Sequence, residues 1–548
     1  MVTRTALLAA CAALAPLGAH AQSNLPAPVE AQELRQLDAW GVSGLSRADG
    51  ALAPDLWNRS DPAFLASVFD RLPATYESPA TRALARRVLL SGGEAPRGDA
   101  QAAARKRFEA LGRMGAADEL SLLAVGASGA LSDPLIAQYA AQAELARGRR
   151  AEACARGRGG ELGATPPPFL LRLRAYCAAA GGDRAAADLA LELARSAGAA
   201  DAWYTAAVAA AGGAPPARPP QARYADTLSA QLSLAARLQP GPNALNDSSV
   251  LALAAVARSD NAPQPLRAQA AALAFQRGAL SAAEARTILA ATPAEITSAL
   301  PPLVTALRAM QAARAAPAPP LAGGAAVPDA SLSVATAIAA ALRGASTPAE
   351  FAAAAAFFKD DIAGLTTAPD HAATLLFIRA AIVNGDAALA QRMLMSARQA
   401  GLDQAALGPL DAALAALSGA RGDQGLTALQ RRIDAAGSAQ ARAASRDVAI
   451  LAALGAPVDG AVLAHLLANP PQGGARADTG AMLALAAAVE RGAQGEAALL
   501  AVAAAGPGGP SRLDAESLDR ILRALRGARL EEDARRIAAE AILAGAPQ

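Results

Sequence analysis

Aromatic side chains are scarce in this chain of 548 residues, where Phe, Trp and Tyr together make up only 3%. β-Branched residues are scarce as well, so the composition argues against β-sheet, which favours both classes. It also argues against aromatic platforms that stack sugars or nucleic-acid bases. Charge of one sign is lacking too, because 50 Lys and Arg face 48 Asp and Glu. The resulting net charge of +2 is not typical of a protein that binds nucleic acid or an anionic membrane.

Side chains suited to covalent or metal chemistry are few. Besides His20, the chain has only His371 and His465, and neither has an acid or a cysteine at ligand spacing. The segment GASGA at 126–130 lacks the second glycine of a nucleophile elbow. The segment GRGGELG at 157–163 lacks the spacing of a dinucleotide-binding loop. The sequence therefore predicts no catalytic, cofactor-binding or metal-binding residue, and a protein that is not an enzyme.

The first residues, MVTRTALLAACAALAPLGAHAQ, have the pattern of an export signal. Arg4 supplies a positive charge, residues 6–17 form an apolar run, and Ala19, His20 and Ala21 form an A-x-A cleavage site before Gln22. We therefore expect residues 1–21 to be a signal peptide that is cleaved between Ala21 and Gln22. No later stretch is apolar enough to span a bilayer, so the mature protein is expected to be periplasmic or secreted, without a transmembrane span.

A lipoprotein is the alternative reading of the same segment. Leu8, Ala9, Ala10 and Cys11 resemble a lipobox, which would make Cys11 a lipidated N-terminus. Only ten residues would then precede the cysteine, and the apolar run continues past it. The cleaved signal peptide therefore remains the preferred prediction.

Alanine and leucine dominate the rest of the chain, and both favour helices. In the C-terminal half, glycines between helix-forming runs recur in steps of 33 to 37 residues, at Gly385, Gly422, Gly455, Gly492 and Gly527. A period of this length with two helices per unit predicts an all-α fold, an α-solenoid of stacked antiparallel helical hairpins. Contacts should be dominated by neighbouring units.

The spacing of small and large apolar residues after these glycines resembles degenerate tetratricopeptide repeats. In that motif a turn glycine is followed five, nine and twelve positions later by a small residue, a large apolar residue and alanine. Two segments match it, Gly182 with Ala187, Leu191 and Ala194, and Gly385 with Ala390, Leu394 and Ala397. The family's Trp, Tyr and closing Pro are missing. The resemblance implies a right-handed superhelix with a concave surface for proteins or peptides.

Helix starts are predicted where Ser or Thr precedes an acid by three residues, as in a capping box. Three segments have this pattern: Ser281 with Glu284, Thr292 with Glu295, and Thr347 with Glu350. Pro293 and Pro348 would occupy the first helical position in the last two. Because these acids already have a structural role, we do not count them as catalytic.

Composition divides the mature chain into four parts. Residues 22–60 form an irregular N-terminal arm, residues 61–311 an N-terminal helical repeat region, and residues 331–548 a C-terminal one. Between the repeat regions, residues 312–330 form a linker rich in Pro, Gly and Ala, which cannot continue a helix. The arm contains two of the three tryptophans, so it either packs on the first helices or docks a partner, and we favour packing.

Cleavage of the signal would leave two cysteines, Cys154 and Cys177. No histidine lies within a hundred residues of Cys177, which argues against a nucleophile. A disulfide in an oxidising compartment needs only this pair, and two free buried thiols are the alternative. The disulfide requires Cα atoms about 4.4 to 6.8 Å apart.

These observations predict an exported, non-enzymatic scaffold or adaptor that binds proteins or peptides of the cell envelope. The alternative is a helical superhelix that assists peptidoglycan-processing enzymes. In that respect the chain resembles the soluble lytic transglycosylases, which carry a long helical superhelix beside a catalytic domain. The sequence contains no segment recognisable as such a catalytic domain.

Overall fold

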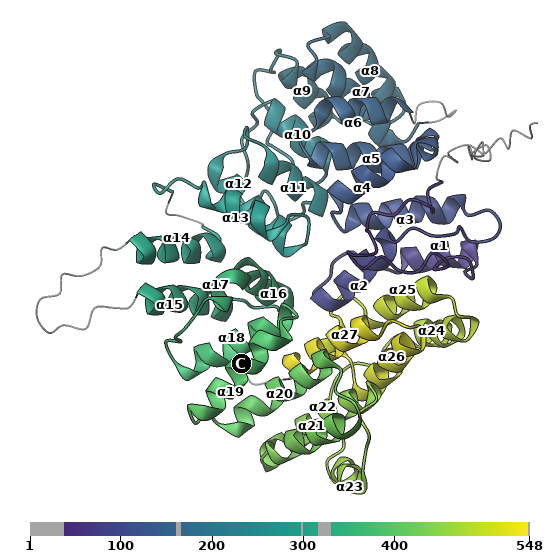
Figure 1. The fold of residues 1–548 in the computed structure, drawn as a ribbon. Coiled ribbons are helices and arrows are strands. Elements are labelled where there is room, and N and C mark those ends of the chain that lie inside the picture. Colours follow the sequence, from purple (N-terminus) through teal and green to yellow (C-terminus); the bar gives the residue numbers. More distant parts are fainter. Residues whose placement is uncertain (1–37, 160–165, 297–299, 316–329, 546–548) are drawn as a thin grey trace, which may run out of the picture. The chain divides into compact units, whose positions relative to one another are not determined.

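The computed structural model describes residues 38–159, 166–296, 300–315 and 330–545. All of them belong to one unit, Leu37–Gln548. The chain is all-helical, with 67% of its residues in helices and no strand in the described ranges. This confirms the expected all-α class and is consistent with an α-solenoid (Figure 1).

The helices before residue 316 are α1 (Pro62–Asp70), α2 (Pro79–Leu90), α3 (Gln101–Arg113), α4 (Ala117–Gly126), α5 (Pro134–Ala146), α6 (Arg150–Gly159), α7 (Pro168–Ala180), α8 (Arg184–Ser196), α9 (Ala202–Ala211), α10 (Thr227–Ala235), α11 (Val250–Arg258), α12 (Gln264–Gln276), α13 (Ala282–Ala290) and α14 (Pro302–Ala315).

The helices after residue 329 are α15 (Ala330–Arg343), α16 (Pro348–Phe357), α17 (Lys359–Ala363), α18 (His371–Val383), α19 (Ala387–Gln399), α20 (Gln404–Ser418), α21 (Gly422–Asp434), α22 (Ala441–Ala453), α23 (Gly460–Ala468), α24 (Thr479–Arg491), α25 (Gln494–Ala505), α26 (Ala515–Gly527) and α27 (Glu531–Ala544). Short 3₁₀ helices are η1 (Ser128–Ser132), η3 (Ser438–Gln440) and η4 (Pro510–Arg512).

Aspartate is the most frequent residue at the helix starts. The predicted helix starts relied on Ser and Thr instead. The aspartate carboxylate accepts hydrogen bonds from first-turn amides, which lack partners within the helix, and its charge favours the positive end of the helix dipole. The aspartates that cap in this way are Asp61, Asp133, Asp183, Asp201, Asp226, Asp370, Asp386, Asp403, Asp459, Asp478 and Asp514.

Two of the three predicted capping positions are confirmed. The hydroxyl of Thr347 accepts from the amide of Glu350 at 3.2 Å, and the hydroxyl of Ser281 accepts from the amide of Glu284 at 3.2 Å. The carboxylate of Glu350 reaches back one residue further than expected, to the amide of Ser346 at 2.7 Å.

The third predicted helix start, at Thr292, is wrong. The chain makes only turns up to Ile296, and the next helix, α14, begins at Pro302. A helix that started at Thr292 would meet Pro301 and Pro302 after about two turns, where proline removes amide donors and clashes with the preceding turn. The local signal was therefore overridden by the prolines that follow it.

Four of the five spaced glycines lie between helices or at a helix start with positive φ, namely Gly385, Gly422, Gly455 and Gly492. The assignment of Gly527 to a turn is wrong, because it is the last residue of α26. Arg529 takes the left-handed conformation of this turn instead, with φ of 61°.

Most close helix contacts join consecutive helices, as in the pairs α5 and α6, α7 and α8, α11 and α12, and α24 and α25 (Figure 1). Alanines on the contacting faces allow the helices to approach closely. Residues of α5 to α10 form a hydrophobic cluster of their own around Phe169, Tyr204 and Leu232. Most of the remaining buried residues join a second, larger cluster.

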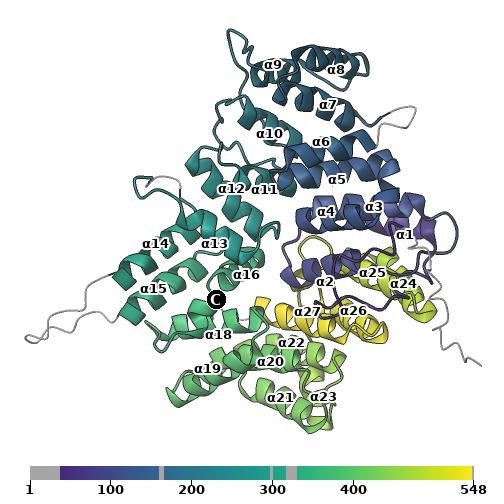
Figure 2. The same cartoon turned by 45° about the horizontal axis from the view of Figure 1, so that its top comes forward.

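The segment predicted as a linker, 312–330, is partly helical. Residues 312–315 belong to α14 and residue 330 begins α15, while 316–329 lie outside the described residues. The two flanking helices pack along each other, and both views place them side by side (Figures 1 and 2). The proposed boundary therefore falls between two helices that share a hydrophobic contact.

Contacts between distant parts of the chain are also extensive, which the expectation of contacts dominated by neighbouring units did not include. Helix α27 packs on α20, and α2 packs on α25 and α27 (Figure 2). Glu77 donates its amide to the carbonyl of Pro507 at 3.0 Å. Arg87 forms an ion pair of 2.6 Å with Asp533. The second and the last described helices, α2 and α27, are thus joined directly.

The described part of the arm, residues 38–60, packs on the helices rather than standing free. Trp40 and Trp57 are buried with their ring centroids 5.4 Å apart. Arg107 on α3 is fully buried beside both rings, with its guanidinium carbon 5.6 Å from the centroid of Trp40 and 6.0 Å from that of Trp57. Leu56 accepts a hydrogen bond from the amide of Gly495 on α25 at 3.2 Å, a contact that the sequence did not suggest.

Candidate functional site

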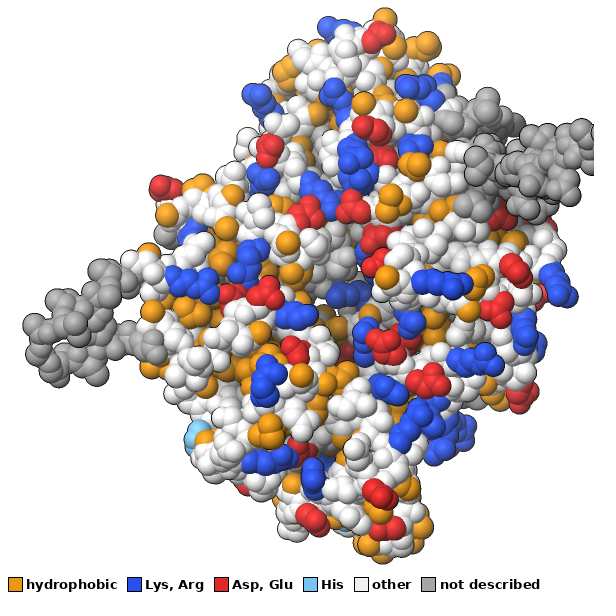
Figure 3. All heavy atoms as spheres, in the orientation of Figure 1, with side chains coloured by type: hydrophobic (Ala, Val, Ile, Leu, Met, Phe, Trp, Pro, Cys, Tyr) orange, Lys and Arg blue, Asp and Glu red, His pale blue; other side chains and the backbone are white. Residues whose placement is uncertain are grey.

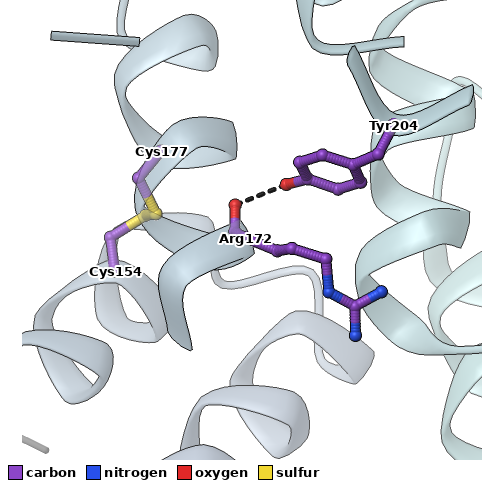
Figure 4. Close-up of a disulfide and its surroundings, with 4 residues drawn as sticks. All are labelled: Cys154, Arg172, Cys177 and Tyr204. Atoms are coloured by element: carbon purple, nitrogen blue, oxygen red, sulfur yellow. Dashed lines mark hydrogen bonds between the residues drawn. A yellow bond between two sulfur atoms is a disulfide. The ribbon is translucent and has the colours of Figure 1, made fainter. Parts of the chain in front are cut away.

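Cys154 and Cys177, the two cysteines predicted to pair, meet in the structure (Figure 4). Cys154 on α6 and Cys177 on α7 have Cα atoms 6.0 Å apart and Sγ atoms at bonding distance, which is disulfide geometry. Beside them the hydroxyl of Tyr204, on α9, donates to the backbone oxygen of Arg172. Burial raises the pKa of Tyr204, so its hydroxyl stays protonated as a donor. The pair joins packed helices and does not line a catalytic cleft.

The other residues singled out from the sequence are not brought together. His371 is exposed at the first position of α18. His465 is half-buried on α23, where Nε2 lies 3.3 Å from the carbonyl oxygen of Ala441. No group of three or more His, Cys, Asp or Glu in the described ranges is placed to hold a metal ion. Ala21, Gln22 and Cys11, which concern the signal, lie outside the described residues.

A cavity of about 870 Å³ lies where α12, α14, α15 and α16 meet the loop after α10. We call it the proline-lined cavity, since its walls include Pro240, Pro242, Pro263, Pro265, Pro301 and Pro302. Leucines and alanines of the four helices complete the apolar walls. Its volume is in the range of pockets that hold small molecules or short peptide segments.

The loop that forms one wall of this cavity is held in a defined conformation. Asn243 has a positive φ of 55° and accepts a hydrogen bond from the amide of Asn246 at 3.0 Å, which closes a turn. Gln239 accepts from the amide of Ala222 at 3.0 Å. Because proline fixes φ, the neighbouring prolines restrict the loop further. The wall is therefore organised before any ligand arrives.

The polar groups of the cavity are amides and one carboxylate. Asn243, Asn246, Gln269 and Gln276 are among the lining residues, and so is Glu350 on α16. Burial alone would raise the pKa of Glu350, but hydrogen bonds from Ser346, Thr347 and Gln276 hold it below the usual value. This carboxylate therefore stays ionised and serves as a hydrogen-bond acceptor. Amides and a carboxylate can bind a peptide backbone, but they do not form a nucleophile with its base.

Sequence reasoning missed this cavity. Two pairs of closely spaced prolines could have indicated the cavity, Pro240 with Pro242 and Pro301 with Pro302. Loops rich in proline have rigid, apolar surfaces. From sequence alone, prolines of this kind indicate only where helices are interrupted.

No protein-family model matches the chain, and no match was found among curated proteins or solved structures. The likeness to tetratricopeptide repeats therefore rests on the spacing of Gly, Ala and Leu alone. Over the described residues, none of the helices combines the length and the hydropathy needed to cross a membrane.

Proposed function

We propose that this chain is an exported, non-enzymatic scaffold or adaptor, built of stacked antiparallel helical hairpins like those of tetratricopeptide proteins. It acts by binding a protein or peptide of the cell envelope. The proline-lined cavity receives an extended segment of that partner.

The observation that carries this proposal is the chemistry of the cavity walls. Apolar side chains and prolines cover most of the surface, and amide side chains stand among them at the positions of Asn243, Asn246 and Gln276. An extended peptide offers backbone donors and acceptors that such amides can pair with, and apolar side chains that the walls can cover. The pre-formed loop lowers the entropy that binding must overcome.

Site-specific crosslinking tests the proposal. A photoreactive amino acid at Ala272, which lines the cavity, should capture a partner in envelope extract. The partner is then identified by mass spectrometry, and its purified form is titrated against two variants. Ala272→Trp fills the cavity and should weaken binding roughly tenfold or more, a change of about 1.4 kcal/mol.

Ala283→Trp is the matched control, because Ala283 is exposed on α13 and does not line the cavity. It should bind as the unaltered protein does. Equal losses in both variants, or a partner crosslinked with the same yield from position 283, would contradict the assignment to the cavity.

Export is tested separately by the N-terminus of the protein isolated from its native cells. Intact mass and N-terminal sequencing should show a chain that begins at Gln22. A lipid-modified chain that begins at Cys11 would support the lipoprotein alternative, and an uncleaved chain would contradict export.

A further inference from the structure

A second cavity, of about 670 Å³, lies among α15, α16, α18, α20 and η4. We call it the arginine-lined cavity, because Arg343, Arg379 and Arg512 line it while Glu77 is the one acid in its lining. Figure 3 shows basic and hydrophobic side chains next to each other over the region of α16 and α18. The cavity therefore combines apolar walls with an excess of positive charge.

Arg379, on α18, is the central residue of this site. Its guanidinium carbon lies 4.6 Å from the ring centroid of Phe351, and its Nε is buried without a hydrogen-bond partner. No hydrogen bond or ion pair links its side chain to another described residue. Burial lowers the pKa of Arg379, but a guanidinium stays protonated at neutral pH. A half-buried charge without a counter-ion is unfavourable, and an anion in the cavity would relieve this.

The other arginines of the cavity already have partners. Arg343 donates to both carboxylate oxygens of Asp370 at 2.9 and 2.8 Å. Arg512 lies 3.5 Å from a carboxylate oxygen of Glu77. The charges of these two arginines are balanced by the paired acids, whereas Arg379 is the one left to bind an anion directly.

Stacking on an aromatic ring does not by itself account for an unpaired arginine here. Arg286 stacks over Phe357, with its guanidinium carbon 5.0 Å from the ring centroid, and it also forms an ion pair of 2.6 Å with Asp361. Arg379 has the same stacking arrangement without the acid. An anionic group of a ligand would take the place beside Arg379 that Asp361 has beside Arg286.

The buried acid that shares a cavity with Arg379 is engaged elsewhere. Arg379 also lines a smaller cavity of about 290 Å³, together with Glu540 on α27. The carboxylate of Glu540 accepts from the amide of Ala80 at 2.8 Å, and Ser78 and Arg82 are its other polar neighbours. Glu540 therefore faces the start of α2 and does not neutralise Arg379.

We propose that the arginine-lined cavity binds a carboxylate whose other end is apolar, with the carboxylate on Arg379. Arginine binds carboxylates through paired, charge-assisted hydrogen bonds. Leu342, Leu375, Leu376 and Leu410 provide apolar walls for the rest of the ligand. The hydroxyl of Thr347 stands at the same cavity and can donate a further hydrogen bond. A fatty acid and the C-terminus of an apolar peptide both present this chemistry. The inference is independent of the function proposed for the proline-lined cavity.

Calorimetric titration of the mature chain with two ligand pairs tests the proposal. Octanoate is compared with octanamide, and a leucine-rich peptide with a free C-terminus is compared with its amidated form. At least one carboxylate should bind roughly tenfold more tightly than its neutral counterpart. Binding of octanoate alone identifies a fatty acid as the source, and binding of the peptide alone identifies a C-terminus. Binding by neither carboxylate, or equally by neutral forms, would overturn the proposal.

Variants locate the binding. Arg379→Gln should reduce carboxylate affinity roughly tenfold or more, and Arg379→Lys should restore part of it because the charge returns without the paired donors. Arg392→Gln is the control, since Arg392 is exposed on α19 and loses the same charge. Unchanged affinity in Arg379→Gln, or an equal loss in Arg392→Gln, would refute the site.

Chemical labelling of the unaltered protein tests the site without the risk that a variant misfolds. Phenylglyoxal modifies accessible arginines, and bound carboxylate should protect Arg379 in the unaltered protein, as measured by peptide mass spectrometry. Arg379→Gln should also melt at the same temperature as the unaltered protein or higher, because it removes an unpaired buried charge. Labelling of Arg379 that the ligand does not slow would contradict the proposal.

Discussion

Arg107 and Arg379 are both arginines in largely apolar surroundings, and they differ in what satisfies their donors. Arg107 donates to three backbone carbonyls, those of Leu89 at 2.8 Å, Ala39 at 2.8 Å and Ser91 at 3.1 Å. Burial lowers its pKa to about 10, which still leaves it charged at neutral pH. Its charge is thus distributed over carbonyl dipoles and tryptophan faces. Arg107 joins the arm to α2 and α3, whereas Arg379 has donors left for a ligand.

Replacing Arg107 with methionine should therefore destabilise the protein by about 3 kcal/mol. The substitution keeps an apolar chain of similar length, but it removes the guanidinium donors from three buried carbonyls, although that of Ser91 keeps the indole Nε1 of Trp57 as a donor at 3.3 Å. Urea unfolding followed by tryptophan fluorescence measures the change. Arg392→Met, at an exposed position, should alter stability by less than about 0.5 kcal/mol. If both variants unfold at the same urea concentration, the assigned role of Arg107 is wrong.

At the scale of helices, the sequence predicted which residues are helical far better than where each helix begins. Capping at Thr347 was predictable because the hydroxyl, the proline and the acid all favour the same boundary. Thr292 carries the same pattern, but the prolines at 301 and 302 leave too little chain for a helix. The cavities were not predictable, because each is formed by loops and helices tens of residues apart. Periodicity indicates which helix face is buried, but it does not indicate the neighbour.

The cysteine pair belongs to the same scale, since it connects α6 to α7. Non-reducing peptide mapping of the protein isolated from its native cells should find Cys154 joined to Cys177. The bridge closes a loop over a sequence separation of 23 residues, so the chain-entropy argument predicts a contribution of about 3 kcal/mol. Cys177→Ser should lower the melting temperature while partner binding at the distant proline-lined cavity is retained. Quantitative alkylation of both thiols in the folded protein would contradict the bridge.

At the scale of the whole molecule, the least predictable feature is a contact between helices from the two ends of the described chain, α2 with α25 and α27. A partial signal was present, because the segment AALLAVAAA of α25 is apolar on every face, which is typical of a helix enclosed on several sides. The sequence could not show that α2 and residues 38–60 are among its neighbours. Such a contact depends on the shapes of surfaces more than 400 residues apart in the chain.

The contact between α2 and α27 should make stability depend on pH. Burial raises the pKa of Glu540 to about 7, from the usual value of 4.5 for a glutamate. Between these values the folded protein holds a proton that the unfolded chain has lost, so stability falls as pH rises from about 4.5 to 7 and levels off above. The change should be about 3 kcal/mol. Glu540→Gln should remove this slope, and Glu490→Gln, at an exposed position of α24, should keep it.

Gly495 provides the sharpest test of the contact between the arm and α25. A methyl group there would lie 2.7 Å from the ring of Trp57 and 3.1 Å from Leu56, closer than packed atoms approach. Replacing glycine with alanine normally stabilises a helix by roughly 0.5 to 1 kcal/mol. This is the expected result for the control Gly460→Ala on α23, where a methyl group meets nothing within 4 Å. Gly495→Ala should instead destabilise by about 1 to 3 kcal/mol through overpacking. Hydrogen exchange should then accelerate together in α2, α25 and α27, because α2 packs on both of the other helices. A stabilising effect at both glycines would show that the arm does not pack on α25.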